Sequence, residues 1–508
     1  MKKLLFTTIL VSASMHLFAQ DFVDNALLFS RTQPGGSARI QALGGVQISL
    51  GGDYSSGLSN PAGLGMYNKS EATLSMGVTN NQTTSTFFGN PSDANRTTFN
   101  IPGFSYVHRQ DNAKDKFQGG TVGVTFSRIN NFNTTYRYEG DNNQSSLIDF
   151  FINDSQGRLP EDMLYGGYDF YSLTGLAYNN YLTQDFEDNG EIVYGSVLTP
   201  LPDEVRTVHQ LEKVIRKGAQ SQLSVSYGGN YDDTFFFGAG MGIVITSFEQ
   251  TQAFEESNFR YSLDASYNPL NYFRTNENFD IQGSGVNFSF GGIYRPLDFL
   301  QVGVSYITPT YYTFTDSYTA SVEGEWNDFD YFGDGSLTLG STSEEFDVPF
   351  ISEYDLRTPG KASLGVTFIN KRGFISGDVE FINYGKAKYS SQFDGESYEP
   401  ENDAIQQEYR NAVNYRIGAE FRHNIYRLRL GYNHQANPYS TNTGTNIALN
   451  TLSGGAGLRF SKFFVDMAIV HAAGETLRVP YNAGSLPSPQ VAIEYRSTHY
   501  MLTLGLPF

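Results

Sequence analysis

The sequence contains no cysteine, one tryptophan and few charged residues. Without cysteine the chain has neither disulfides nor thiolate metal ligands, and it lacks the residue to which a lipoprotein anchor is attached. Charged residues make up only 17 % of the 508 residues, which is low for a soluble protein of this size. This scarcity of charge favours a chain whose surface is partly out of water.

Basic residues and catalytic motifs are also scarce. The net charge is −19 and no basic stripe interrupts it, which excludes nucleic acid as a partner. The chain has no Gly-x-Ser-x-Gly elbow, no HExxH and no phosphate loop, so we expect no enzyme activity. The acidic loop with Asp328, Asp330 and Asp334 departs from calcium-loop spacing. No metal or cofactor is predicted, because the histidines are scattered without ligand spacing: His16, His108, His209, His423, His434, His471 and His499.

Long apolar runs are missing except at the N-terminus. Lys2 and Lys3 precede an apolar stretch from Leu4 to Phe18, and Ala19 offers a small residue for cleavage near Gln20. This pattern predicts a signal peptide over residues 1–20, and hence export. No later run of about 18 apolar residues predicts a transmembrane helix. An exported chain of this kind is either soluble or embedded as a β-barrel.

Aromatic residues and period-two alternation are what the chain has in abundance. Aromatics make up 15 % of the residues, with 34 tyrosines and 40 phenylalanines, and there are 52 glycines. In 373–383, 412–423 and 425–433, apolar side chains occupy one parity and charged or polar side chains the other. A strand with this pattern has one apolar and one polar face.

The connections between such segments alternate in length. Short turns are QDNAKDK, NYDD, PLD, NKR, HN and SK, and long loops cover about 80–98, 129–217, 248–281, 326–350, 386–408, 436–448 and 473–488. This segregation is typical of outer-membrane barrels, whereas a soluble sandwich, the alternative, has no reason for it. We therefore predict an all-β transmembrane barrel over residues 70–508. About fourteen antiparallel strands are expected, near 70–79, 99–109, 118–128, 218–230, 234–247, 282–295, 299–325, 351–369, 373–385, 409–423, 425–435, 449–460, 462–472 and 489–508.

The last strand ends on an aromatic residue of the apolar parity. That pattern is similar to the terminal signal by which the barrel-assembly machinery recognises its substrates. The residues of this predicted signal are Tyr500, Leu502, Leu504, Leu506 and Phe508.

The insertion at 129–217 is too long to lack structure, so we predict that it is partly helical and extracellular. Segment 202–217 has acidic residues first, basic residues last and an apolar stripe, and it predicts an amphipathic helix. Segment 145–154 predicts a shorter one. The apolar side chains of the insertion either form a private core or capture an apolar ligand. The candidate capture residues are Leu147, Ile148, Phe150, Phe151, Tyr165, Tyr168, Phe170 and Tyr171.

The charged parity of the later strands projects into the predicted lumen. These side chains either form a salt-bridge network that grips whatever fills the barrel, or a polar ring that guides a ligand head group. The residues are Asp378, Glu380, Arg416, Glu420, Arg422, Arg427 and Arg429.

Something must close a barrel this wide, and residues 21–69 are the available material. This Gly-rich segment contains GSARIQALGGVQISLGGDYSSGLSNPAGLGMY, with Asn60, Pro61 and Ala62 near its end. A signal peptide, such a segment and about fourteen strands together resemble the FadL/TodX family of outer-membrane channels. In that family Asn-Pro-Ala belongs to a hatch inside the lumen.

The resemblance implies a passive outer-membrane channel for hydrophobic small molecules such as long-chain fatty acids, embedded in outer-membrane lipid and gated by the hatch. It also implies a lateral opening beside a kinked third strand, here with Gly119, Gly120 and Gly123. The tyrosine and asparagine content and the FAQ signal end resemble Bacteroidetes proteins of Gram-negative type. In that group similar barrels also serve protein secretion, as PorV does, so the alternative is a shuttle that binds secreted proteins through its loops.

Overall fold

The computed structural model describes residues 22–112, 116–391, 393, 397–440 and 446–508. The predicted signal peptide lies outside the described residues. Among the described helices, none is long and apolar enough to cross a bilayer.

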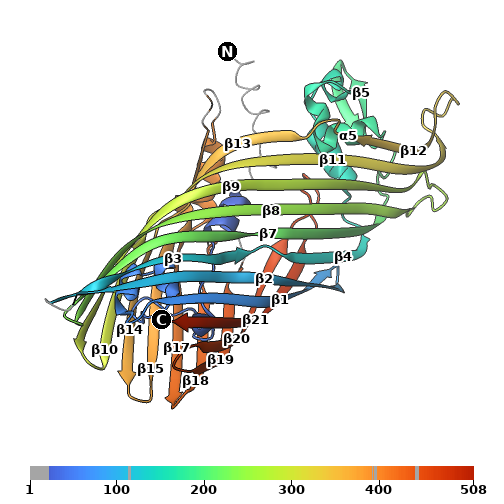
Figure 1. The fold of residues 1–508 in the computed structure, drawn as a ribbon. Helices are drawn as coiled ribbons and strands as arrows, with labels where there is room; N and C mark the ends of the chain where they lie inside the picture. Colours follow the sequence, from blue (N-terminus) through green and yellow to red (C-terminus); the bar gives the residue numbers. More distant parts are fainter. Residues whose placement is uncertain (1–21, 113–115, 392, 394–396, 441–445) are drawn as a thin grey trace.

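The strands form a closed, antiparallel barrel of 14 spanning strands (Figure 1). The ring closes because β21 pairs with β1 from Glu71↔Pro507 to Thr86↔Ala492. Several spanning strands are interrupted and continue under a second label, and β12 extends the sheet beside β11. Successive bounds are β1 (Glu71–Phe87), β2 (Asn90–Asp111), β3 (Phe117–Asn131) with β4 (Thr134–Asn142), β7 (Arg206–Tyr231), β8 (Phe235–Tyr261), β9 (Leu270–Leu297), β10 (Leu300–Ile307) with β11 (Tyr311–Asp330), β12 (Thr338–Glu345), β13 (Phe350–Arg357) with β14 (Lys361–Asn370), β15 (Gly373–Asn383) with β16 (Lys388–Ser390), β17 (Asn411–His423), β18 (Tyr426–Gln435), β19 (Leu449–Arg459), β20 (Phe464–Arg478) and β21 (Val491–Pro507).

The barrel wall shows the alternation on which the prediction rested. On β8, Phe235, Phe237, Met241, Ile243 and Ile245 are exposed on the outside, and residues of the other parity, such as Phe236 and Val244, face inward. An outward apolar face on a closed barrel fits lipid and not water. The sandwich alternative is wrong, because the sheet closes on itself instead of packing against a second sheet.

Each of the fourteen predicted strands is present, but many run further than expected. β7, β8 and β9 have 26, 27 and 28 residues, so much of the predicted loop at 248–281 is strand. Strands of this length exceed the roughly 9–11 residues needed to cross a bilayer. Their ends opposite the short turns therefore project beyond the membrane, where the cap packs on them.

The helix predicted over 202–217 is wrong, because Arg206 begins strand β7. The segment has an apolar stripe at helical spacing, but its alternate residues Val208, Gln210, Glu212 and Val214 are buried on one face of the strand. The strand pairs with β4 and with the outer part of β8. Tertiary pairing thus overrides the local helical pattern.

The insertion that follows β4 forms a compact cap at one end of the barrel (Figure 1). The helix predicted at 145–154 is confirmed as α3, which a capping box of Ser146 and Asp149 begins. The cap's elements are α3 (Leu147–Ser155), α4 (Pro160–Met163), η3 (Tyr168–Phe170), α5 (Leu173–Asn179), β5 (Gln184–Asp188) and β6 (Glu191–Gly195).

Residues 22–69, called the N-terminal segment below, lie within the ring of strands (Figure 1). Residues 22–30 are helical, and short turns of helix follow at α2 (Ala38–Gln41), η1 (Tyr54–Leu58) and η2 (Pro61–Met66). Further along the chain, η4 (Tyr384–Lys386) and α6 (Glu399–Glu408) connect β15, β16 and β17.

Candidate functional site

Asn60, Pro61 and Ala62 are held directly against the barrel wall. Asn60 is fully buried and caps η2, where its Oδ1 accepts from Ala62 N at 3.2 Å. Its Nδ2 donates to Ile48 O at 2.5 Å and lies 3.4 and 3.3 Å from the carbonyl oxygens of Gly292 on β9 and Val304 on β10. One amide therefore joins two parts of the N-terminal segment to two strands.

A ring of inward-facing glycines receives the N-terminal segment. A Cβ on any of them would come within 3 Å of an atom of this segment, so its backbone lies directly on the wall. This close approach explains why glycine is required there. The ring, which we call the glycine seat, consists of Gly228 on β7, Gly238 on β8, Gly291 on β9, Gly303 on β10, Gly365 on β14, Gly418 on β17, Gly431 on β18 and Gly455 on β19.

Polar side chains of the wall bind the segment's backbone between the glycines. Asp378 Oδ2 accepts from the amides of Gln47 and Ile48 at 2.8 and 3.1 Å. Thr503 Oγ1 accepts from Ala38 N at 2.8 Å, and Ser453 Oγ from Gly44 N at 3.0 Å. Because these contacts come from β15, β19 and β21, the segment is fixed around the bore and not at one edge.

Among the described residues, five of the seven predicted lumen charges form ion pairs, whereas Asp378 and Arg427 bind backbone groups. Arg416 pairs with Glu380 at 2.9 Å. Glu420 pairs with Arg422 at 2.7 Å and Arg429 at 2.6 Å, and Arg39 of the N-terminal segment lies 3.7 Å from it. These ion pairs and the contact with Arg39 favour the first hypothesis, a salt-bridge network that holds the N-terminal segment.

Besides Asp378, the network differs from the expected set at three residues. Asp466 and Arg459 belong to it, since Asp466 pairs with Arg429 at 2.7 Å and with Arg459 at 2.8 Å. Arg427 does not join it, and instead donates to the carbonyl oxygens of Asn424 and Tyr426. The sequence signal for Asp466 was available, because it lies at an inward position of an alternating strand.

We expect Asp466→Asn to destabilise the barrel strongly. Arg429 and Asp466 are both inaccessible to solvent, and removing one partner of a buried pair costs about 3–5 kcal/mol. The matched control is Glu494→Gln, whose partner Arg496 is exposed and whose loss costs about 0–1 kcal/mol. Urea unfolding in phospholipid vesicles measures both free energies. Equal effects from the two variants would contradict a structural role for the network.

A packed apolar core, which we call the chamber because the chain's own helix fills it, lies further along the bore. Val23, Ala26, Leu27 and Phe29 of the helix at 22–30 pack inside it, and Phe29 stacks on Phe314 with ring centroids 4.8 Å apart. The strand residues that line this chamber include Val244, Phe248, Ile281, Tyr312, Phe314, Tyr354 and Leu356. The chain's own helix thus occupies the space that an apolar ligand would need.

The candidate capture residues divide into two groups. Leu147, Ile148, Phe150, Phe151 and Phe170 are buried in a core that joins the cap to the inner faces of β8, β9 and β11. Tyr171 packs against this core, whereas Tyr165 and Tyr168 are 69 % and 89 % exposed. Most of the set therefore forms a private core, and the exposed part is confined to two tyrosines.

The strand pairing between β2 and β3 stops partway along the barrel. The ladder runs from Asp111↔Gly119 to Gly103↔Ser127, and above it β3 and β4 pair only with β7. There Thr83 of β1 donates to Thr135 O at 2.8 Å, a side-chain contact in place of a ladder. We call this interruption the seam.

The three glycines proposed for a lateral opening lie below the seam. Gly119, Gly120 and Gly123 are paired on one side with β2 and on the other with β7. Gly119 adopts φ +113° beside a register shift, and Gly123 lies close to Leu64 of the N-terminal segment. Both the seam and these glycines involve β3, but the glycines lie at its start, beside the short turn, and the seam begins after Ser127.

The residues of the predicted assembly signal lie on the outer face. Tyr500, Leu504, Leu506 and Phe508 are 40–63 % exposed, and Leu502 is partly exposed. Within the part of the chain that the structure describes, no group of three or more histidines, aspartates or glutamates is placed to hold a metal ion.

Comparison with known proteins gives a likeness in fold. No protein-family model matches the chain, and no curated protein matches it significantly. Among solved structures it is similar to a Pseudomonas aeruginosa FadL homologue, with 14 % identity over 94 % of this chain and 99 % of that one and a TM-score of 0.56. It is also similar to the Ralstonia pickettii toluene transporter TbuX, with 14 % identity, 94 % and 99 % coverage and a TM-score of 0.51.

The Pseudomonas putida toluene transporter TodX gives the same result, with 12 % identity, coverage of 94 % and 100 %, and a TM-score of 0.50. At this level of identity the comparison concerns the fold alone. The resemblance to FadL/TodX barrels expected from the sequence is confirmed at that level, over nearly the whole length of each chain.

Proposed function

We propose that this chain is an outer-membrane channel for passive uptake of hydrophobic small molecules such as long-chain fatty acids. The observation that carries the proposal is the apolar chamber inside a lipid-facing barrel, filled by the amphipathic helix at 22–30. If the helix moves out, the aromatic and aliphatic side chains around it line the kind of cavity that takes an apolar ligand. The similar structures of toluene transporters support the same class of cargo.

In this proposal the N-terminal segment is the hatch. A ligand that enters the chamber competes with Val23, Leu27 and Phe29 for the same apolar surface. The helix continues into the segment seated on the glycines, so its displacement loosens contacts near the periplasmic end. The seam above Ser127 supplies a lateral exit toward lipid, in place of the glycines suggested by the resemblance. Recognition of the last strand by the barrel-assembly machinery is likewise a proposal.

Uptake of a labelled long-chain fatty acid by a bacterial strain without its own channel tests this function. We expect Phe314→Ser in the chamber to lower uptake several-fold, because it removes an apolar contact surface that is fully buried. Phe290→Ser makes the same chemical change on the lipid face, where Phe290 is 51 % exposed, and we expect uptake to stay at the parent level. Heat-modified migration on a gel checks that both variants fold.

Absence of uptake by the folded parent protein would contradict the channel. Equal losses in the two variants would show that the chamber is not the path.

The second candidate is a shuttle that binds secreted proteins, similar to PorV. It is favoured by a packed cap at the outer mouth together with exposed Leu159, Leu164, Tyr165 and Tyr168 on the cap surface. Purifying the protein from membranes and identifying what co-purifies distinguishes the two functions. Bound fatty acid or hydrocarbon supports the channel, whereas a bound secreted protein that Tyr165→Ser with Tyr168→Ser releases supports the shuttle.

A further inference from the structure

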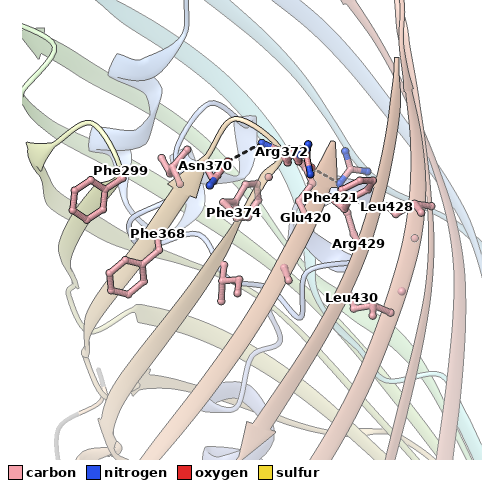
Figure 2. Close-up of a pocket in the computed structure, with 16 residues that line it drawn as sticks. Phe299, Phe368, Asn370, Arg372, Phe374, Glu420, Phe421, Leu428, Arg429 and Leu430 are labelled. Carbon is pink, nitrogen blue, oxygen red and sulfur yellow. Dashed lines mark hydrogen bonds and ion pairs between the residues drawn. The ribbon is translucent and has the colours of Figure 1, made fainter. Parts of the chain in front are cut away.

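The outer wall of the barrel has a hollow of about 940 Å³ beside the short turns (Figure 2). Its apolar lining includes Phe368, Ile375, Phe421, Leu428 and Leu430, which are each more than half exposed. Figure 2 shows Asn370 and Arg372 at the turn end, with Phe368 and Leu430 farther along the strands. The hollow therefore runs from a turn onto the lipid-facing wall.

Small residues create the hollow. The paired positions of one level are Phe368, Ile375, Ala419, Leu430 and Gly454 on successive strands. Ala419 and Gly454 interrupt a row of large side chains, and they line the hollow. At the next level Gly373 pairs with Phe421 and has no side chain. A depression between large apolar residues fits an acyl chain better than a flat wall does.

Three of the short turns at this end carry positive charge in an otherwise acidic chain. Lys371 and Arg372 form the β14–β15 turn, His423 ends β17, and Lys462 lies in the β19–β20 turn. These three turns contain no aspartate or glutamate, and the one carboxylate in the neighbouring β9–β10 turn is Asp298, next to Phe299 of the hollow. Among the described residues, no carboxylate forms an ion pair with Lys371 or Arg372, although the chain's net charge is −19.

We propose that this hollow binds one anionic phospholipid of the inner leaflet. The acyl chain lies against Phe368, Ile375 and Leu430, and the phosphate binds Arg372 beside Lys371. The inference rests on the proposed outer-membrane location, because short turns mark the periplasmic side, where the leaflet consists of phospholipid. Juxtaposed cations attract anionic headgroups by about 1 kcal/mol each, whereas a zwitterionic headgroup gains little. The site is thus selective for charge as well as for apolar chains.

Native mass spectrometry of the full-length protein in detergent tests the site. Phosphatidylglycerol and phosphatidylethanolamine with identical acyl chains are titrated separately. We expect the parent protein to retain phosphatidylglycerol more tightly by about fivefold for each cation engaged. Glycerol phosphate, which carries the headgroup charge without acyl chains, is expected not to compete.

Two pairs of variants separate charge from shape. Lys371→Gln with Arg372→Gln should reduce the affinity for phosphatidylglycerol to that for phosphatidylethanolamine, whereas Lys116→Gln at the β2–β3 turn should not. Gly454→Phe should fill the hollow and weaken binding of both lipids, since a Cβ there meets only Leu430 Cδ2 at 3.5 Å and Arg429 O at 3.6 Å. Its control is Gly292→Phe, on the outer face of β9, where the nearest atoms are 3.8 and 3.9 Å away.

Equal retention of the two lipids by the parent protein overturns the proposal, and that measurement needs no variant to fold. Unchanged selectivity in the Lys371 and Arg372 variant also overturns it. Competition by glycerol phosphate would indicate a simple anion site, and a dimer without lipid would indicate a second copy on this face, and either result contradicts a phospholipid site. Loss of fatty-acid uptake bears on the proposed function and leaves this result unaffected.

Discussion

Replacing Gly291 by leucine is expected to release the N-terminal segment from the barrel wall. A Cβ at this position would overlap Asn60 Oδ1, the side chain that joins β9 and β10 to Ile48. Both the strand and the buried asparagine must move, because neighbouring parts of the glycine seat leave no free space. Overpacking of this kind costs about 1–3 kcal/mol. This free-energy cost weakens the contact between the N-terminal segment and the wall, because the new side chain points inward and leaves the outer face of β9 unchanged.

Trypsin added from the periplasmic side measures this release. Arg39 has a side chain that is only 13 % exposed, so the parent protein should resist cutting there. In Gly291→Leu we expect cleavage after Arg39 to be at least about tenfold faster, in line with the lost contact energy. Ion conductance in planar bilayers should rise in the same variant. Asn60→Ala with Pro61→Ala should act in the same direction, because it removes the cap of η2 and its hydrogen bonds to the wall.

The adjacent glycine provides the control. Gly292 faces outward, and a Cβ there meets nothing closer than 3.8 Å, so Gly292→Leu should leave the segment seated. If the two leucine variants are cut at the same rate, the glycine seat does not hold the segment. Resistance to trypsin in both variants would likewise contradict the argument.

Alternation alone predicted the strands because lipid and lumen impose opposite chemistry on neighbouring residues. The start of β7 was wrongly predicted as a helix, because its inward residues Gln210 and Glu212 bind polar partners that lie far along the chain. Glu212 binds Arg478, and Gln210 binds Glu256 and Tyr481. A polar residue that is buried by a distant partner looks like a solvent-facing residue in sequence, so the apolar stripe at helical spacing decided the prediction.

The glycine seat was missed for a related reason. In Val302-Gly303-Val304 and Leu364-Gly365-Val366, a glycine occupies the inward position between two outward apolar residues. Inward positions are polar in other parts of the strands, and a glycine at such a position indicates that another backbone approaches closely. The pattern repeats at Ile417-Gly418-Ala419, so a search for inward glycines would have found much of the seat. It could not have shown which segment fills it, because that depends on the path of residues 38–66 inside the bore.

The seam gives the prediction with the largest effect on transport. We expect a disulfide between Thr83→Cys and Thr135→Cys to abolish fatty-acid release while leaving the ligand bound. Thr83 Oγ1 lies 2.8 Å from Thr135 O, so the two backbones pass close together without ladder hydrogen bonds. A covalent link replaces this weak contact and prevents β1 and β2 from separating from β4. The parent chain has no cysteine, so only the engineered pair is able to form a disulfide.

Uptake before and after reduction measures the effect. The oxidised variant should be inactive, and reduction should restore the parent rate, which excludes misfolding as the cause. The control pair is Tyr106→Cys with Val124→Cys, which are directly opposite in the β2–β3 ladder below the seam. A disulfide there fixes strands that are already paired, so uptake should not change. If the oxidised Thr83 and Thr135 variant still transports, the ligand leaves past the N-terminal segment into the periplasm, because the chamber then has no open route through the wall at β2 and β3.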